Sequence, residues 1–354
     1  MGSVYSARLE GAHGFEKGVA VKVIHPHLAE DRHALTMFLD EARVASLIQH
    51  INVCAVIDFG VEEGLPFLVM ELLRGASLGA LMRGGERPRR LPCDVAARIA
   101  VDAARGLHAA HELRGEDGRP LGLVHRDVSP ENLYVLGEGV TKVLDFGVAR
   151  MKGRLASTLA EEIKVKVRYM APEQLESGDE DRRADVWALG VVLWEATLGR
   201  DLFRGDTFVA TMDQVLDAEI PRPEAVDPGY PEDLARVVRG ALERDVERRI
   251  PSAESMADDL ERYLYGTGEP CGAAQVAAYS RRCSPSEPER AAEPGLRSSV
   301  ALAPGLGFDE TRSLDADPRL VGGLPPAAPA ADVRDPEETD TAEVTLPRRA
   351  VAAA

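Results

Sequence analysis

Apolar residues follow two periods along the chain, every second position near the N-terminus and every three to four positions further on. The alternation predicts strands at Val19–Ile24, 53–59 and 66–70, with a turn at 62–64 between the last two. The longer period predicts a helix at about 31–49, after the first of these strands. Residues 1–72 are therefore expected to form a small, β-rich lobe.

From Pro92 onward the pattern is almost entirely helical. Ser252 suits the N-cap of the last helix, because a serine side chain accepts a hydrogen bond from a free N–H of the first turn. A larger helical lobe over residues 73–265 follows, and a cleft between two such lobes is a common ligand site. The predicted helices cover about 94–113, 183–198, 207–218, 231–243 and 253–264.

Near Gly266 the composition changes to Pro, Ala, Gly, Ser and acidic residues, with few aromatic side chains. Low hydrophobic density and frequent proline cannot offset the entropy lost on folding, so residues 266–354 are predicted to be a disordered tail. The expected architecture is an α+β, bilobal domain over residues 1–265, followed by this tail.

The chain is acidic, with 42 Lys and Arg against 59 Asp and Glu and a net charge of −17. That balance argues against nucleic acids and anionic membranes as partners, since both attract positive surfaces. No apolar run approaches the roughly 20 residues of a membrane span, and the N-terminus lacks a signal-peptide pattern. The four cysteines form no CxxC pair, so we expect reduced thiols and a cytoplasmic location.

The residues that can carry chemistry begin with the run His-Arg-Asp-Val-Ser-Pro-Glu-Asn at 125–132. Asp127 can accept the proton of a hydroxyl, and Asn132, on the same tight loop, can bind a divalent cation. Asp145-Phe146-Gly147 follows an apolar strand and offers a second oxygen ligand for Mg²⁺. Either motif alone could be an ordinary loop, but the two in this order predict a phosphoryl-transfer centre.

Together with Lys22 in Val-Ala-Val-Lys upstream and Ala171-Pro172-Glu173 downstream, these motifs resemble the protein kinase family, in particular the eukaryotic-like serine/threonine kinases of bacteria. The resemblance covers residues 1 to about 265. It implies a bilobal kinase fold that uses ATP and Mg²⁺, or Mn²⁺, to phosphorylate Ser and Thr hydroxyls of protein substrates, its own chain included.

The resemblance also implies roles for single residues. Lys22 would contact the α- and β-phosphates and pair with Glu41 on the helix between the strands. Asp127 would be the catalytic base. Asn132 and Asp145 would hold the metal ion.

The nucleotide site is expected at the hinge between the lobes, which resembles Met70-Glu71-Leu72-Leu73. Met70 would be the gatekeeper, and the main chain of Glu71 and Leu73 would bind adenine. Ordinary core packing is the other interpretation of the apolar positions. The remaining expected contacts are Gly2 and Val4 at the phosphate-binding loop, Val4, Ala20 and Leu133 around the adenine ring, and Ser77 at the ribose.

Three further matches concern the frame around this site. Glu173 is expected to pair with Arg249, and Asp185 to brace the catalytic loop through main-chain amides. Arg126 would need an anion, which a phosphate on Ser157 or Thr158 would supply, unless these two are unphosphorylated linker residues.

The sequence departs from the family at its start. Only the end of the glycine-rich loop is present, as Gly2-Ser3-Val4, without the preceding strand and two glycines. We expect that the natural protein begins upstream of Met1. If it does not, the phosphates lose their lid and ATP affinity is weak.

A second departure lies in the catalytic loop. Ser129 stands where the family has lysine, and Lys166 stands where it has threonine. We predict that Lys166 supplies the missing ammonium, bonds Asp127 and Ser129, and neutralises charge on the γ-phosphate. A solvent-facing Lys166 is the other interpretation.

A pseudokinase or scaffold that binds nucleotide or partners without turnover is the alternative function. The shortened loop favours it, and the intact set of Asp127, Asn132 and Asp145 opposes it. Small-molecule kinases of related fold are disfavoured by the motifs around Asp185 and Glu173. In the tail, four threonines beside acidic residues are candidate autophosphorylation sites for a phosphothreonine-binding partner, namely Thr311, Thr339, Thr341 and Thr345.

Overall fold

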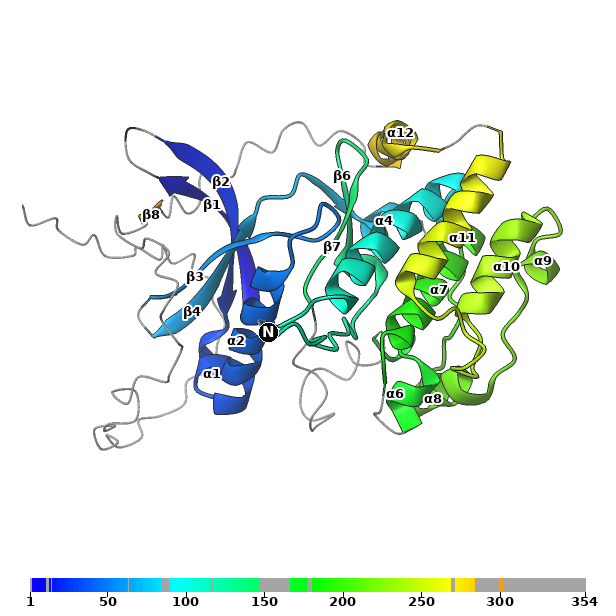
Figure 1. The fold of residues 1–354 in the computed structure, drawn as a ribbon, viewed down its shortest axis with the longest axis horizontal. Coiled ribbons are helices and arrows are strands. Elements are labelled where there is room, and N and C mark those ends of the chain that lie inside the picture. Colours follow the sequence, from blue (N-terminus) through cyan, green and yellow to red (C-terminus); the bar gives the residue numbers. More distant parts are fainter. Residues whose placement is uncertain are drawn as a thin grey trace, which may run out of the picture. The chain divides into compact units, whose positions relative to one another are not determined.

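The computed structural model describes residues 2–10, 13, 15–62, 64–83, 89–115, 117–146, 166–176, 180–268, 271–283 and 299–301 (Figure 1). The chain divides into two units. The first comprises Met1–Ser6 and Val19–Arg290, and the second comprises Ala7–Gly18 and Ala291–Ala354.

The small lobe of the first unit is a sheet in which β3, β4, β2 and β1 lie in that order. β2 (Glu16–Ile24) and β3 (Val56–Glu62) both pair antiparallel with β4 (Leu65–Glu71), which places Lys22 opposite Leu68. The strands predicted at 53–59 and 66–70 are thus present, the former shifted toward the C-terminus. β1 spans Gly2–Glu10.

Two helices connect β2 to β3, α1 (Pro26–Ala29) and α2 (Arg32–Leu47). Phe38 and Ala42 of α2 pack with Ile24 and Leu68 of the sheet in one buried cluster. The loop after α2 is then fastened to the larger lobe, where Asn52 Nδ2 donates to the Thr141 carbonyl over 2.9 Å. The small lobe is therefore anchored near the strands that carry the catalytic loop.

The larger lobe is built around α7 (Arg183–Leu198), whose residues 184–198 are all buried. A helix that is apolar all round belongs in the centre of a core, and α4 (Cys93–His111), α10 (Glu232–Ala241) and α11 (Ala253–Gly266) pack beside it (Figure 1). The shorter helices of this lobe are α3 (Leu78–Met82), α6 (Pro172–Glu176), α8 (Phe208–Asp217) and α9 (Pro223–Val226).

The helix predictions from periodicity are confirmed. α7 spans the predicted 183–198, and the other predicted helices agree within two residues at each end. The Ser252 side chain accepts from Ser255 N over 3.0 Å, so the predicted N-cap of α11 is confirmed as well.

A three-stranded sheet lies where the two lobes meet, with β6 (Leu133–Leu136) between β5 (Gly75–Ser77) and β7 (Thr141–Val143). A short 3₁₀ turn over Pro130–Asn132 leads directly into β6. The catalytic loop is thereby held at one end of this sheet, and Asp145 follows β7 at the same end.

The prediction that the tail begins at residue 266 is wrong, because a helix follows that residue. Residues 273–283 form the helix α12 (Ala273–Cys283), which buries Val276, Ala277 and Tyr279 against α4 and β6 (Figure 1). The short apolar face of this helix is not apparent from the average composition of the residues after Gly266. Of the later residues, only β8 (Ser299–Ala301) is described, and it pairs in parallel with Arg8, Leu9 and Glu10 of β1 in the second unit. The four candidate threonines of the tail lie outside the described residues.

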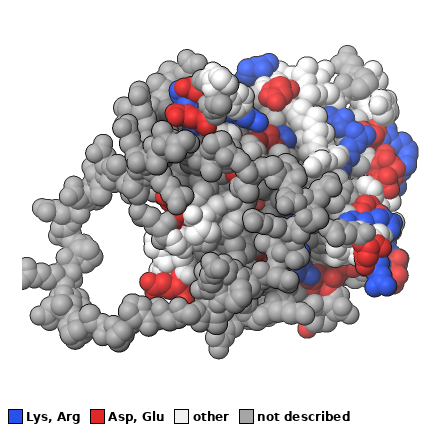
Figure 2. Space-filling model, turned by 60° about the vertical axis from the view of Figure 1, so that its left-hand side comes forward, with Lys and Arg blue, Asp and Glu red and all other residues white. Residues whose placement is uncertain are grey.

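No helix within the described ranges is both long and apolar enough to cross a membrane. On the described part of the face shown in Figure 2, acidic and basic side chains lie interspersed and form no continuous basic patch.

Candidate active site

Two predicted catalytic residues, Asp127 and Lys166, and the predicted metal ligand Asn132 meet at the Asp127 carboxylate. Asn132 Nδ2 donates to the Asp127 carbonyl over 2.7 Å and to Asp127 Oδ2 over 3.2 Å. Lys166 Nζ lies 3.0 Å from the same Oδ2, and the Lys166 side chain is 35% exposed. The solvent-facing alternative for Lys166 therefore does not describe this structure. Ser129 is buried, and in the described contacts Lys166 reaches Asp127 but not Ser129.

His125 joins the catalytic loop to the chain before Asp145. Its Nε2 lies 2.8 Å from the Leu144 carbonyl, and its Nδ1 accepts from Asp127 N over 3.2 Å. These two bonds require the tautomer protonated at Nε2. The ring also packs against Phe146, with 4.7 Å between ring centroids. The predicted base Asp127 and the predicted metal ligand Asp145 are thus held in fixed relation.

Asp185 braces the catalytic loop as predicted, through main-chain amides. Its carboxylate accepts from His125 N and Arg126 N, each over 2.8 Å, and lies 2.7 Å from His111 Nε2. Burial alone would raise the pKa of Asp185, but the hydrogen bond and charge of His111, together with the hydrogen bond from the His125 main-chain N–H, hold the pKa below its usual range. Asp185 therefore remains an anion inside the core.

Lys22 points from β2 toward the second predicted metal ligand. Its Nζ lies 2.8 Å from Asp145 Oδ1, and its side chain is 7% exposed. Asp145 itself has a left-handed backbone, with φ of 46°. The side chain of Glu41 lies outside the described part of the structure, as does Gly147, so the Lys22–Glu41 ion pair stays a prediction.

The donor set suits a hard cation such as Mg²⁺. With Asn132 Nδ2 directed at Asp127, the amide oxygen is left for a metal, and the Asp145 side chain is 43% exposed. Among the described residues, no three His, Cys, Asp or Glu side chains gather closely enough to hold a metal alone. Mg²⁺ is commonly held by one or two protein oxygens together with substrate phosphates, so the two ligands fit the ion in the presence of ATP.

The predicted hinge lies at the end of β4. In the described structure the Leu73 main chain makes no hydrogen bond to protein, so both its N–H and its carbonyl can form hydrogen bonds with adenine. Two hydrogen bonds hold the Glu71 carboxylate in place, because Oε1 accepts from Lys142 Nζ and from Ala55 N, each over 2.7 Å. Nearby, burial raises the pKa of the Cys54 thiol to about 12, so Cys54 stays protonated at neutral pH.

One predicted nucleotide contact is wrong. Leu133 is 0% exposed and belongs to the core of the larger lobe. Side chains alternate along a strand, so its neighbour Tyr134 points to the opposite face of β6. Tyr134 pairs with Ser77 and donates its hydroxyl to the Gly75 carbonyl over 2.9 Å, just after the hinge. Strand alternation counted from Asn132 distinguishes the two positions, so Tyr134 replaces Leu133 as the candidate nucleotide contact.

The other predicted nucleotide residues occupy compatible places. Ala20 pairs with Met70 across β2 and β4, while Val4 on β1 is 59% exposed. Gly2 has a structural reason to be glycine, because a Cβ there would lie 2.3 Å from the Val23 carbonyl oxygen. Ser77 is the N-cap of α3, and its hydroxyl accepts from Ala80 N over 3.1 Å.

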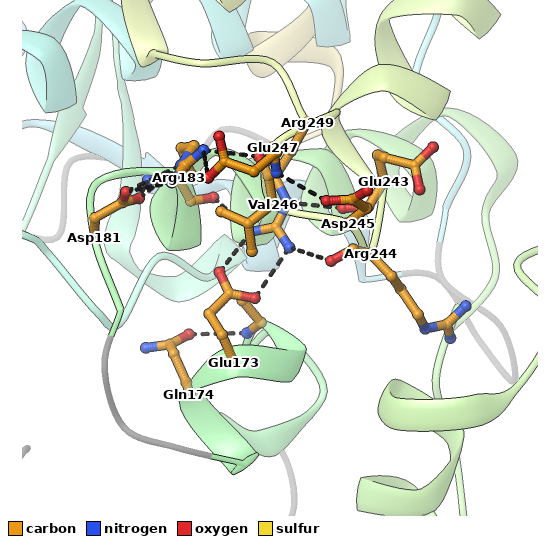
Figure 3. Close-up of polar contacts among 11 residues, drawn as sticks. Glu173, Gln174, Asp181, Arg183, Glu243, Arg244, Asp245, Val246, Glu247 and Arg249 are labelled. Atoms are coloured by element: carbon orange, nitrogen blue, oxygen red, sulfur yellow. Dashed lines mark hydrogen bonds and ion pairs between the residues drawn. The ribbon is translucent and has the colours of Figure 1, made fainter.

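The frame that supports the catalytic loop contains the predicted ion pair between Glu173 and Arg249. Arg249 is a fully buried side chain that meets the two Glu173 oxygens over 2.6 and 3.0 Å (Figure 3). It also donates to the carbonyls of Glu243 and Arg183 and lies over the Trp187 ring. The guanidinium thus joins α6 to the start of α7 and to the chain before α11.

Arg126 has a different anion from the one predicted. Its Nε lies 2.7 Å from Glu180 Oε1. Ser157 and Thr158, the candidate phosphorylation sites, lie outside the described residues.

Comparison with known proteins agrees with this geometry. The profile of the family described as "Protein kinase domain" matches residues 1–260. A tyrosine-protein kinase, MasK of Myxococcus xanthus, is 40% identical over 280 residues, which cover 79% of this chain and 43% of MasK. The serine/threonine-protein kinase PknL of Mycobacterium tuberculosis is 36% identical over 246 residues, which cover 70% of this chain and 59% of PknL.

Among solved structures, the Mycobacterium tuberculosis PknI kinase domain superposes with a TM-score of 0.54 at 26% identity, and covers 74% of this chain and 90% of that one. The chain spans about half the length of the two curated relatives. The profile match, the fold and the arrangement of catalytic-loop residues agree, and the chain belongs to the protein kinase family.

Proposed function

We propose that this chain transfers the γ-phosphate of ATP to serine or threonine hydroxyls of protein substrates. The observation that carries the proposal is the contact of Asp127 with both Asn132 and Lys166, beside the Lys22–Asp145 pair. Base, metal ligands and two ammonium groups are the protein-borne parts of a phosphoryl-transfer centre. A pseudokinase would have no need to keep all of them.

In the proposed reaction the substrate oxygen bonds to the γ-phosphorus while the bond from this phosphorus to the β–γ bridging oxygen breaks. Asp127 takes the hydroxyl proton, and ADP is the leaving group. Lys166 offsets negative charge beside Asp127, from the position where it now contacts Oδ2. Its catalytic role replaces that of the lysine missing at Ser129.

We assign the metal to Asn132 and Asp145, which would hold Mg²⁺, or Mn²⁺, against the phosphates. The ion would neutralise negative charge on the phosphoryl group during its transfer. Lys22 would orient the α- and β-phosphates, and the main chain of Glu71 and Leu73 would bind adenine between Ala20 and Tyr134.

Serine and threonine are preferred in this proposal because PknL is a serine/threonine-protein kinase, whereas MasK, a tyrosine-protein kinase, favours tyrosine. A cytoplasmic location and autophosphorylation remain part of the proposal.

The test incubates the purified full chain with γ-labelled ATP, Mg²⁺ and a protein substrate rich in Ser, Thr and Tyr, beside an Asp127→Asn variant. We expect label that depends on Asp127 and is recovered as phosphoserine and phosphothreonine after hydrolysis. Label recovered as phosphotyrosine would transfer the assignment to tyrosine. Nucleotide binding without Asp127-dependent label would support the pseudokinase instead.

A further inference from the structure

Arg126, the residue before the proposed base, is held at its side chain by a buried glutamate. Arg126 Nε lies 2.7 Å from Glu180 Oε1, and the Glu180 side chain is only 1% exposed. Within the described residues, neither Glu180 oxygen nor Arg126 Nε makes a hydrogen bond of good geometry. The contact is therefore an attraction between charges. Removing Arg126 would leave the Glu180 carboxylate buried without a counter-charge, and removing Glu180 would leave the Arg126 guanidinium, which is 26% exposed, without one.

The same stretch of chain also holds the Arg126 main chain. Arg126 N donates to Asp185 Oδ1 over 2.8 Å, and Asp185 follows Glu180 at the start of α7. Residue 126 needs this support because its φ is +67°, a left-handed conformation unfavourable for a side chain with a Cβ. Asp185 and Glu180 thus fix both ends of the residue that precedes Asp127.

The Arg126–Glu180 ion pair is present in the same structure as the assembled catalytic centre. With Arg126 on Glu180, Lys166 contacts Asp127 and Lys22 contacts Asp145. An anion for Arg126 is hence provided from outside the segment between Asp145 and Ala171, where the sequence suggested a phosphate.

We infer that Glu180 is a positioning residue that supplies the negative charge Arg126 requires, so that turnover does not depend on phosphate at Ser157 or Thr158. This inference rests on the proposed function. It adds that the kinase is built to be active without phosphorylation of its own activation segment.

The kinetic test uses the Ser157→Ala/Thr158→Ala chain, dephosphorylated beforehand, beside Glu180→Gln, Glu180→Asp and the exposed control Glu176→Gln. We expect the alanine chain and the control to keep turnover within about twofold. Glu180→Gln should lose about tenfold or more in kcat, with little change in the KM for ATP, and Glu180→Asp should recover part of it. Loss of turnover in the alanine chain, or full turnover in Glu180→Gln, overturns the inference.

A second measurement does not need activity. Urea unfolding of Arg126→Met, Glu180→Met and the double variant forms a double-mutant cycle. We expect the double variant to shift the urea midpoint by less than the sum of the single shifts. Additive shifts would overturn the ion pair even if all variants were inactive, whereas a coupled pair in a chain without Asp127-dependent label would count against the proposed function alone.

Discussion

At the scale of single residues, the most unusual feature is the position of the ammonium group that we propose to be catalytic. Lys166 comes from the chain just before α6, yet its Nζ lies 3.0 Å from Asp127 Oδ2. Ser129, two residues after Asp127, carries a neutral hydroxyl and provides no cation. The charge is thus supplied from the opposite side of the loop, and the two positions should behave as one functional unit.

We predict that Lys166→Thr lowers kcat by about 10² or more, the usual cost of removing one group that stabilises transition-state charge. Adding Ser129→Lys to Lys166→Thr should recover at least about tenfold, because it returns the ammonium to the loop. Steady-state kinetics on the full chain measure both effects, and Lys17→Met, at an exposed lysine, is the control. Unchanged turnover in Lys166→Thr would refute a catalytic role.

At the scale of elements, α12 depends on one glycine in the turn between β6 and β7. Gly139 has φ of +91°, and a Cβ there would lie 1.9 Å from the Ala273 carbonyl oxygen at the start of α12. No other residue allows the helix and the turn to approach so closely.

Gly139→Ala should therefore detach α12 or destabilise the larger lobe. The loss in the free energy of unfolding should exceed by about 1–3 kcal/mol the loss from the same substitution at a positive-φ glycine without neighbours. Gly118→Ala is the matched control, since Gly118 has φ of +75° with nothing within 4 Å of the added Cβ. Thermal unfolding and amide exchange over residues 273–283 measure the difference. Equal behaviour of the two variants would mean that α12 does not need this contact.

The elements also show which parts of the fold can be predicted from sequence. Long amphipathic helices such as α4 and α10 repeat the helical period often enough to fix their bounds within two residues. The four-residue strand β6 does not, because Leu136 is buried in addition to Leu133 and Val135, and the prediction of Leu133 as a nucleotide contact is wrong there.

The candidate site divides in the same way. Motif spacing predicts the Asp127–Asn132 loop, and the resemblance to the protein kinase family implies the Glu173–Arg249 pair and the Asp185 brace, since each is a recurrent arrangement. The Arg126–Glu180 pair was missed because it depends on how the chain before α7 returns to the catalytic loop. No local pattern around Glu180 marks it as buried.

At the scale of the whole molecule, the buried Asp185 connects the central helix α7 with α4 and with the catalytic loop. Its contacts to His111, His125 N and Arg126 N stabilise the anion, which lowers the pKa of Asp185 in the folded chain relative to the unfolded one. A carboxyl whose folded pKa is depressed contributes stability above its unfolded pKa of about 3.9 and loses that contribution as pH falls through the folded value.

Asp185→Asn should accordingly cost about 3–5 kcal/mol at pH 7, as for other buried charges that lose a partner, because an amide cannot accept all three hydrogen bonds. The difference from wild type should shrink below about pH 4, because the Asp185 carboxyl of the unfolded wild-type chain takes up its proton there while that of the folded chain is still ionised. Urea unfolding from pH 7 to pH 3 measures this, with Asp213→Asn at an exposed position as the control. A difference that stayed constant over that range would assign the loss to shape and hydrogen-bond geometry, and the charge of Asp185 would then have no part in holding the catalytic loop to the core.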